Sequence, residues 1–358
     1  MSLLVVDSIK KYFPLKSGFG KPQNWVKAVD GVSFKVNKDS VFAVVGESGC
    51  GKSTVARLIL KLLSFTDGRI FFKGEDILSI KGEELKKFRR SVQIVFQDPF
   101  ASLNPRMRVV DTLSEPFKIH RIAAKHQIKD RGAGLLEKVG LSADALNKYP
   151  HEFSGGQRQR ICIARALTVS PELIVADEPL SALDVSIQAQ ILNLLQDIKK
   201  ETAISIVFIS HDLKVVHYLS DEVAVMYLGK IVEIGETEEL FKSPKHPYTK
   251  LLLASAPVLR HRGTEKGRKR ETGKQGNGET EKRRNGDSKL HPFADSPIHP
   301  FTYSFHPIHR FTTDVPSPIT IPNGCPFHPR CPERMDICDK TVPELKETGG
   351  GLTACHLY

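Results

Sequence analysis

A glycine-rich stretch between an apolar run and a helical pattern has the residue types needed to bind phosphate. Residues 46–53 read Gly-Glu-Ser-Gly-Cys-Gly-Lys-Ser, which matches G-x-x-x-x-G-K-[ST]. In this pattern, glycines let successive backbone N–H groups surround a β-phosphate, and the following helix N-terminus adds partial positive charge. Lys52 would contact the β- and γ-phosphates, and Ser53 would offer its hydroxyl to Mg²⁺. The pattern predicts a nucleoside triphosphate site formed by Gly46, Ser48, Gly49, Cys50, Gly51, Lys52, Ser53 and Thr54.

A pair of acids that follows another apolar run could supply the rest of the chemistry. Residues 173–176 are directly followed by Asp177 and Glu178. In an open α/β sheet, ligands gather at the carboxyl ends of the strands, which is where these acids would fall. Asp177 could hold Mg²⁺, and Glu178 could orient the attacking water as a general base. Alone, such a pair would be an ordinary surface feature, but beside a phosphate loop it predicts hydrolysis.

The elements that must position these residues are short apolar runs alternating with helical patterns, which predict an α/β domain. The runs carry few polar residues, as strands buried on both faces of a parallel sheet do. They lie at 41–45, 92–96, 173–176 and 204–209, with helical patterns at 53–63, 156–167 and 187–201. With 358 residues and 40% hydrophobic content, the chain can bury one large core and a smaller appendage.

A second glycine-containing segment points to a family. Residues 153–160 read Phe-Ser-Gly-Gly-Gln-Arg-Gln-Arg and open a helical pattern upstream of the acid pair. This resembles the signature of the ABC transporter ATPases, with Phe153 in place of the usual leucine. A serine and glycine amides at a helix N-terminus form a phosphate site, here from Ser154, Gly155, Gly156 and Gln157. Since the chain already has a phosphate loop, this second site implies a head-to-tail dimer with ATP between two cassettes.

Further markers of this family follow in order along the chain. Gln97 resembles the glutamine that senses Mg²⁺ and water and couples to the membrane partner. Residues 181–184 resemble the D-loop, which ends at Asp184, and His211 resembles the switch histidine that contacts the γ-phosphate. Tyr12 resembles the aromatic residue that stacks on adenine, with Phe13 as an alternative. The resemblance implies catalytic roles for Glu178, His211 and Gln97, and Mg²⁺ held by Ser53, Gln97 and Asp177.

The resemblance extends to one branch of the family, the dipeptide/oligopeptide importer ATPases. It rests on residues 97–107, 246–249, 315–318 and 324–332, and residues 156–158 are more similar to the F-type subunit than to its D-type partner. It implies a P-loop NTPase fold: an ABC cassette over 1–257 with a RecA-like core, an antiparallel β subdomain and a helical subdomain near 99–168. A small C-terminal cysteine module is expected over 314–358.

Four of the six cysteines fall in that last segment. Cys325, Cys331, Cys338 and Cys355 supply enough thiolates to close a tetrahedral metal site. In a reducing compartment such a group suggests metal before disulfides. Zinc usually prefers closer pairs, and some members of the importer family carry a [4Fe–4S] cluster here, so the resemblance favours the cluster. Zn²⁺ and four plain reduced thiols stay open as alternatives.

Composition predicts where the cassette ends and where the protein works. The net charge of +11 comes largely from residues 260–289, within an expected low-complexity insert at 258–313 that is basic and then rich in His and Pro. Such a tract is typical of a solvated segment rather than a nucleic-acid site, and no nucleic-acid partner is expected. No apolar run of about 18 residues occurs and the N-terminus lacks the features of a secretory signal. We therefore expect a cytoplasmic protein on the inner face of the cell membrane.

The motifs together predict the ATP-hydrolysing subunit of a peptide importer. By resemblance, its partners are a second ABC ATPase (identical or a paralogue), two membrane permeases and an extracytoplasmic substrate-binding protein. Oligosaccharide and nickel importers use related ATPases and are alternatives for the cargo. A nucleic-acid-linked ABC ATPase is a further alternative, although such proteins tend to carry insertions within the cassette or two cassettes per chain. The acid at Glu178 argues against a nucleotide binder without turnover.

Overall fold

The computed structural model of the chain describes residues 2–15, 24–255 and 316–358, which form two sheets and the helices around them. The expected insert at 258–313 lies outside the described residues, and its character stays a prediction. The larger sheet has eight strands in the order β11-β12-β10-β9-β3-β8-β7-β6. Its strands are β3 (Val41–Val45), β6 (Val92–Val95), β7 (Leu173–Asp177), β8 (Ser205–Ser210), β9 (Glu222–Tyr227), β10 (Lys230–Glu236), β11 (Lys346–Glu347) and β12 (Gly351–Thr353).

The centre of this sheet confirms the expected α/β fold. Strands β6, β7, β8, β3 and β9 pair in parallel, and every residue of β3, β7 and β8 is buried. Burial on both faces explains why these strands appear in the sequence as continuous apolar runs. The expected strand limits differ from the observed ones by about one residue, because the polar residues Asp177 and Ser210 continue the pairing past the apolar runs.

A four-stranded antiparallel sheet, in the order β2-β1-β4-β5, forms the β subdomain. Its strands are β1 (Ser2–Pro14), β2 (Trp25–Asn37), β4 (Asp67–Phe72) and β5 (Glu75–Asp76). A buried apolar cluster joins both sheets through helix α1 (Lys52–Ile59), with Val32 and Phe34 from β2, Val55 and Ile59 from α1 and Ile209 from β8 among its members. This shared core fixes α1, and therefore the loop before it, between the two sheets.

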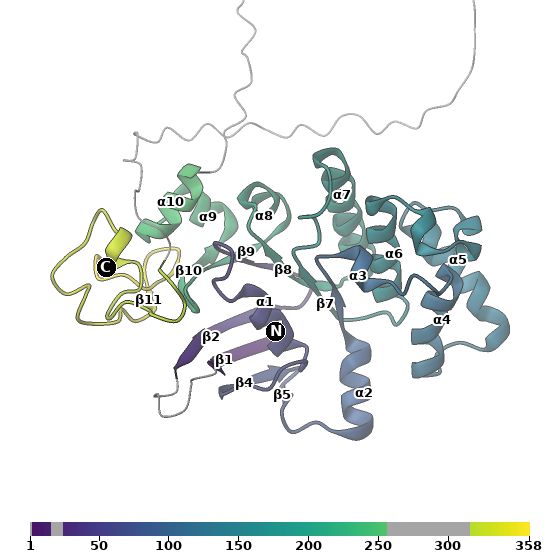
Figure 1. Cartoon of the computed structure of the whole chain (residues 1–358), viewed down its shortest axis with the longest axis horizontal. Helices are drawn as coiled ribbons and strands as arrows, with labels where there is room; N and C mark the ends of the chain where they lie inside the picture. Colours follow the sequence, from purple (N-terminus) through teal and green to yellow (C-terminus); the bar gives the residue numbers. More distant parts are fainter. Residues whose placement is uncertain (1, 16–23, 256–315) are drawn as a thin grey trace, which may run out of the picture. The chain divides into compact units, whose positions relative to one another are not determined.

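The helical region between β6 and β7 agrees with the expected helical subdomain. Helices α4, α5 and α6 contact one another and gather at one end of the chain's described part (Figure 1). The helices of this region are α3 (Pro99–Ser102), α4 (Val109–His120), α5 (Ile128–Lys138) and α6 (Gly155–Leu167), with short 3₁₀ turns at Lys125–Gln127, Ala143–Asn147 and Pro150–Glu152. The other helices are α2 (Gly82–Ser91), α7 (Val185–Thr202), α8 (Leu213–Leu219), α9 (Thr237–Lys242) and α10 (Pro247–Ser255). None of the helices in the described ranges is both long and apolar enough to cross a membrane.

The C-terminal segment 316–358, where a small cysteine module was expected, joins the larger sheet. Strand β12 pairs antiparallel with β10, and β11 pairs with β12, so the segment extends the eight-stranded sheet. The described residues 316–358 accordingly belong to the same compact unit as the described residues before 256. Backbone pairing with β10 anchors the segment to the rest of the chain.

Candidate active site

The phosphate loop lies between β3 and α1, as the motif predicts. Gly46 has a φ of 154° and Gly51 a φ of 109°, backbone conformations that favour glycine. A Cβ at Gly46 would collide with the Met226 carbonyl, and one at Gly51 with the Ala28 carbonyl. The loop is therefore pressed between β9 and β2, which allows its amides to face a phosphate. Ser48 and Gly49 are exposed, Ser53 and Thr54 are half-buried, and Cys50 is buried.

Lys52 is the cation of the site, and its ammonium group is almost wholly enclosed. The residue is 4% exposed, and Nζ donates to the carbonyl oxygens of Gly46 (2.8 Å) and Glu47 (3.0 Å). It lies 3.9 Å from Oε1 of Glu178. Burial raises the pKa of the nearby Cys50 thiol, although Lys52 acts in the opposite direction. Cys50 is thus a buried thiol of the loop rather than a reactive one.

The expected magnesium ligands from the two motifs meet directly. Asp177 ends β7 and Ser53 follows Lys52 on α1, and the Ser53 hydroxyl donates to Oδ1 of Asp177 at 2.9 Å. Burial raises the pKa of Asp177, and the negative charge of Glu178 acts in the same direction, while the hydrogen bond from Ser53 lowers it. A hydroxyl oxygen beside a carboxylate oxygen is the donor set that Mg²⁺ prefers, so these two residues fit that ion.

The Glu178 carboxylate contacts side chains that follow two neighbouring strands. Its Oε2 accepts from Nε2 of Gln97 at 3.3 Å and lies 3.3 Å from Nδ1 of His211. Gln97 follows β6 and His211 follows β8, so the carboxyl ends of neighbouring strands deliver all three side chains. Glu178 has a φ of 47°, and its N–H donates to the Ile209 carbonyl at 3.0 Å. A left-handed backbone held by the neighbouring strand aims this carboxylate toward Lys52, Gln97 and His211.

Tyr12 lies on β1 and is tied to the strand beside the loop. Its hydroxyl donates to Oδ1 of Asp30 at 2.5 Å, and Lys27 lies 5.7 Å from the ring centroid. Burial, followed by the hydrogen bond to Asp30, raises the pKa of Tyr12. Asp30 is two residues from Ala28, whose carbonyl lies against Gly51. The stacking of Tyr12 on adenine stays a prediction.

The signature residues, 154–157, lie at the start of α6. They are separated in sequence from the group around Glu178 and contact other residues. Ser154 caps α6: its Oγ accepts from the Gln157 N–H (3.3 Å) and its own N–H donates to Oε1 of Gln157 (3.0 Å). A Cβ at Gly156 would collide with Ile187 of α7, so the turn packs closely there. Ser154 itself is exposed. Asp184 is likewise exposed, at the position before α7.

The structure adds two residues, Tyr248 and Arg330, to the surroundings of the phosphate loop that the sequence analysis did not connect with it. The Glu47 N–H donates to the Tyr248 hydroxyl at 3.0 Å. The Arg330 guanidinium donates to both carboxylate oxygens of Glu47, at 3.0 and 3.1 Å. Both partners fall in motifs that marked the importer family, but nothing in their spacing tied them to residue 47.

The four C-terminal cysteines line one small cavity together with His246, Phe327 and Met335, among others. Burial raises the pKa of Cys325 and of Cys331 to about 11 and also raises that of Cys355. Among the described residues, no three His, Cys, Asp or Glu side chains are arranged to hold a metal ion. The four thiols share one place, and the iron–sulfur cluster expected there stays a prediction.

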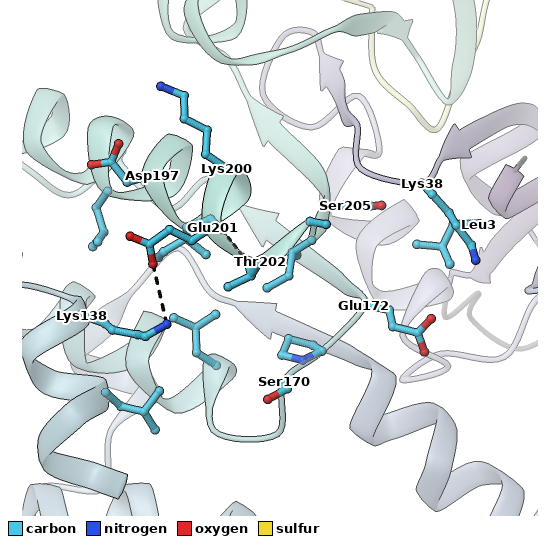
Figure 2. A pocket seen from close by; sticks show the side chains of 17 residues that line it. Leu3, Lys38, Lys138, Ser170, Glu172, Asp197, Lys200, Glu201, Thr202 and Ser205 are labelled. Atoms are coloured by element: carbon cyan, nitrogen blue, oxygen red, sulfur yellow. Dashed lines mark hydrogen bonds and ion pairs between the residues drawn. The ribbon is translucent and has the colours of Figure 1, made fainter.

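The large cavity in Figure 2 is on a different part of the protein. It is lined by the residues that precede β7 and β8 and by the end of α7, including Glu172, Glu201 and Ser205. Lys138 and Glu201 face each other there with an Nζ–Oε2 distance of 3.7 Å (Figure 2). Glu172 and Ser205 mark the amino ends of their strands, whereas ligands of parallel sheets gather at the carboxyl ends. This cavity is not the nucleotide site.

Comparison with protein families gives two matches. A family described as "ABC transporter" matches residues 29–181. A family described as "Oligopeptide/dipeptide transporter, C-terminal region" matches residues 232–284 and 290–338. The second match covers most of the expected insert as well as three of the four C-terminal cysteines, Cys325, Cys331 and Cys338.

Individual transport proteins are similar to this chain over nearly its whole length. The chain is 46% identical over 360 residues to the oligopeptide transport ATP-binding protein AppF of Bacillus subtilis, covering 100% of this chain and 98% of that protein. It is 41% identical to the dipeptide transport ATP-binding protein DppF of Escherichia coli, covering 99% and 93% of the two chains. Among solved structures, an ATP-binding cassette described as a post-hydrolysis dimer bound to ADP and Pi has a TM-score of 0.58 at 26% identity, covering 65% of this chain and 98% of that one.

Proposed function

Because the chain belongs to the ATP-binding proteins of the oligopeptide/dipeptide ABC transporter family, we propose that it powers peptide uptake through membrane permeases. It is an ABC ATPase. Sequence similarity extends over nearly the full length of peptide-transporter relatives, which favours a peptide cargo over an oligosaccharide or nickel. The nucleic-acid alternative receives no support from these matches.

The observation that carries the mechanism is the convergence of Gln97, Glu178 and His211 beside Lys52. Lys52 would neutralise the β- and γ-phosphates, and Ser53 and Asp177 would hold Mg²⁺, which supplies further positive charge against the phosphates when bound. Glu178 would accept a proton from the attacking water. Gln97 and His211 each contact the same carboxylate oxygen and would orient it. Gln97 as a Mg²⁺ ligand stays a prediction, because its amide nitrogen here faces Glu178.

The other half of the site would come from a second ATPase subunit. Ser154 is exposed and its hydrogen bonds are made within its own helical turn, which leaves the start of α6 open to a phosphate from outside. The similarity to a cassette solved as a dimer supports this arrangement. We further propose two permeases and an extracytoplasmic binding protein as partners, with the chain on the inner face of the cell membrane.

Reconstitution tests the transport function directly. The chain, its partner ATPase and the permeases would be incorporated in vesicles with the binding protein. We expect ATP hydrolysis to rise when a dipeptide or oligopeptide is added and to stay at its basal rate with an oligosaccharide or with Ni²⁺. Stimulation by duplex DNA without permeases would contradict the proposal, and stimulation by Ni²⁺ alone would overturn the peptide cargo.

We also propose that the four C-terminal thiols bind a [4Fe–4S] cluster, supported by their shared cavity and by thiolate donor chemistry. No step of hydrolysis involves it. Protein purified without oxygen should be brown, should absorb light at about 400 nm and should contain about four irons per chain. Cys331→Ser should bleach it while ATP binding stays measurable, and Cys162→Ser, at a buried cysteine of α6, should leave the colour unchanged. A colourless protein with about one zinc per chain would establish the Cys₄ zinc site instead.

A further inference from the structure

Arg330 of the C-terminal segment contacts the phosphate loop through Glu47. Arg330 and Glu47 form a two-pronged ion pair, with Nη1–Oε2 at 3.0 Å and Nη2–Oε1 at 3.1 Å. The Arg330 side chain is 8% exposed and that of Glu47 is 27% exposed. A forked, largely buried guanidinium–carboxylate pair fixes the direction of both side chains, unlike the exposed pairs common on protein surfaces.

Arg330 is itself held by an aromatic cluster beside the loop. Tyr227, Tyr248 and Phe327 are each at most 1% exposed, and their ring centroids lie 4.6 to 5.4 Å apart. Arg330 Nη1 also donates to the Tyr227 hydroxyl at 3.4 Å. Phe327 and Arg330 come from the C-terminal segment, whereas the two tyrosines come from β9 and α10. Packing of Phe327 among the tyrosines therefore sets the position of the guanidinium.

Glu47 links this cluster to the groups that would meet the phosphates. Its N–H donates to the Tyr248 hydroxyl, and its carbonyl accepts from Lys52 Nζ at 3.0 Å and from the Cys50 N–H at 3.3 Å. A shift of Glu47 would therefore move both the loop amides and the carbonyl that orients Lys52. Since phosphate binding depends on preset N–H directions, a loosened loop would bind less tightly.

We propose that Arg330 is a positioning residue of the nucleotide site: through Glu47, the C-terminal segment holds the phosphate loop in its ATP-binding shape. The inference rests on the proposed ATP site and deepens it. It gives the C-terminal segment a role in nucleotide affinity. Cys331, one of the four C-terminal cysteines, directly follows Arg330 in the chain. By linkage, ATP bound at the loop would stabilise the packing of the segment to the same extent.

Nucleotide affinity of the full-length chain measures this coupling. Arg330→Ala should raise the Kd for ATP about 5- to 10-fold, with the loss falling on affinity more than on kcat at saturating ATP. Arg330→Lys should recover only part of it, because an ammonium cannot fork across the carboxylate. Arg334→Ala is the matched control: Arg334 lies in the same segment and pairs at 2.8 Å with Asp339, which is not part of the loop. Its Kd should stay near that of the wild type.

A double-mutant cycle separates positioning from general destabilisation. Glu47→Ala should weaken ATP binding about as much as Arg330→Ala, and the double variant should be no weaker than either single one. If Arg330→Ala does not fold, Tyr248→Phe decides, because it removes the acceptor of the Glu47 N–H while keeping the ring; its Kd should rise about 3-fold. Wild-type affinity in Arg330→Ala, additive losses in the cycle, or unchanged affinity in Tyr248→Phe would overturn the inference. Absence of ATP binding by the wild type would instead overturn the function itself.

Discussion

Replacing Glu178 with glutamine should lower the rate of ATP hydrolysis about 10²- to 10⁴-fold while leaving ATP binding intact. The amide keeps the shape of the side chain and its contact with Gln97, but it can no longer accept a proton from water. Lys52, Ser53 and Asp177 are unchanged, so the phosphates and Mg²⁺ keep their ligands. Loss of the negative charge 3.9 Å from Lys52 Nζ frees that ammonium for the phosphates, so affinity should not fall. Single-turnover hydrolysis and equilibrium binding of ATP measure the two effects separately.

Glu172→Gln is the matched control for this variant. Glu172 directly precedes the strand that Glu178 follows, and it pairs with Lys73 at 3.0 Å on the side of the sheet shown in Figure 2. The same chemical change at the opposite end of β7 should leave hydrolysis within about twofold of the wild type, since Glu172 contacts only Lys73 and the Ser91 hydroxyl among the described side chains, and both contacts lie away from the nucleotide site. Near wild-type turnover in Glu178→Gln would show that another group acts as the base.

The parallel core and the placement of Gln97, Glu178 and His211 were predictable because the signals are local. Strands β3, β7 and β8 are buried on both faces, so each appears as an apolar run. Once the runs are taken as neighbouring parallel strands, the residues that follow them must meet at one edge of the sheet. Gln97 and His211 do meet Glu178 there: Nε2 of Gln97 and Nδ1 of His211 each lie 3.3 Å from Oε2 of Glu178. The agreement concerns their placement, and their roles await the experiments above.

The contacts of Arg330 and Tyr248 with Glu47 could not be predicted, because these residues are far apart in sequence. Arg330 and Glu47 are separated by 283 residues and Tyr248 and Glu47 by 201. No periodicity or spacing connects residues across such distances; the contact depends on how β9, α10 and the C-terminal segment pack around Phe327. The pairing of the C-terminal segment with β10 was not predictable either, because the two-residue strand β11 and the three-residue strand β12 are too short to leave a sequence signal.

Replacing Ser154 with arginine should abolish ATP-dependent dimerisation and lower turnover at least about 100-fold, while each chain still binds ATP through its own loop. The exposed start of α6 would face the γ-phosphate bound by the partner cassette. Arginine there would fill the space that the phosphate needs and cover the helix N-terminus. Loss of the hydrogen bond that Ser154 Oγ accepts from Gln157 costs only about 1 kcal/mol of helix capping. Size-exclusion chromatography of Glu178→Gln with and without Ser154→Arg, in ATP, measures the dimer.

Two control variants test whether the loss of dimerisation depends on position 154 itself or only on the change of side chain. Ser142→Arg introduces the same side chain at another exposed serine of the helical region, one that precedes a 3₁₀ turn without capping it, and should leave ATP-dependent dimerisation unchanged. Ser154→Ala removes the cap without adding bulk and should weaken dimerisation only partly, because the helix amides stay free. Normal dimerisation of Ser154→Arg would mean that the signature does not face the nucleotide of a second subunit. In that case the hydrolytic site would have to be complete within one chain, with Lys52, Glu178 and His211 acting without a partner.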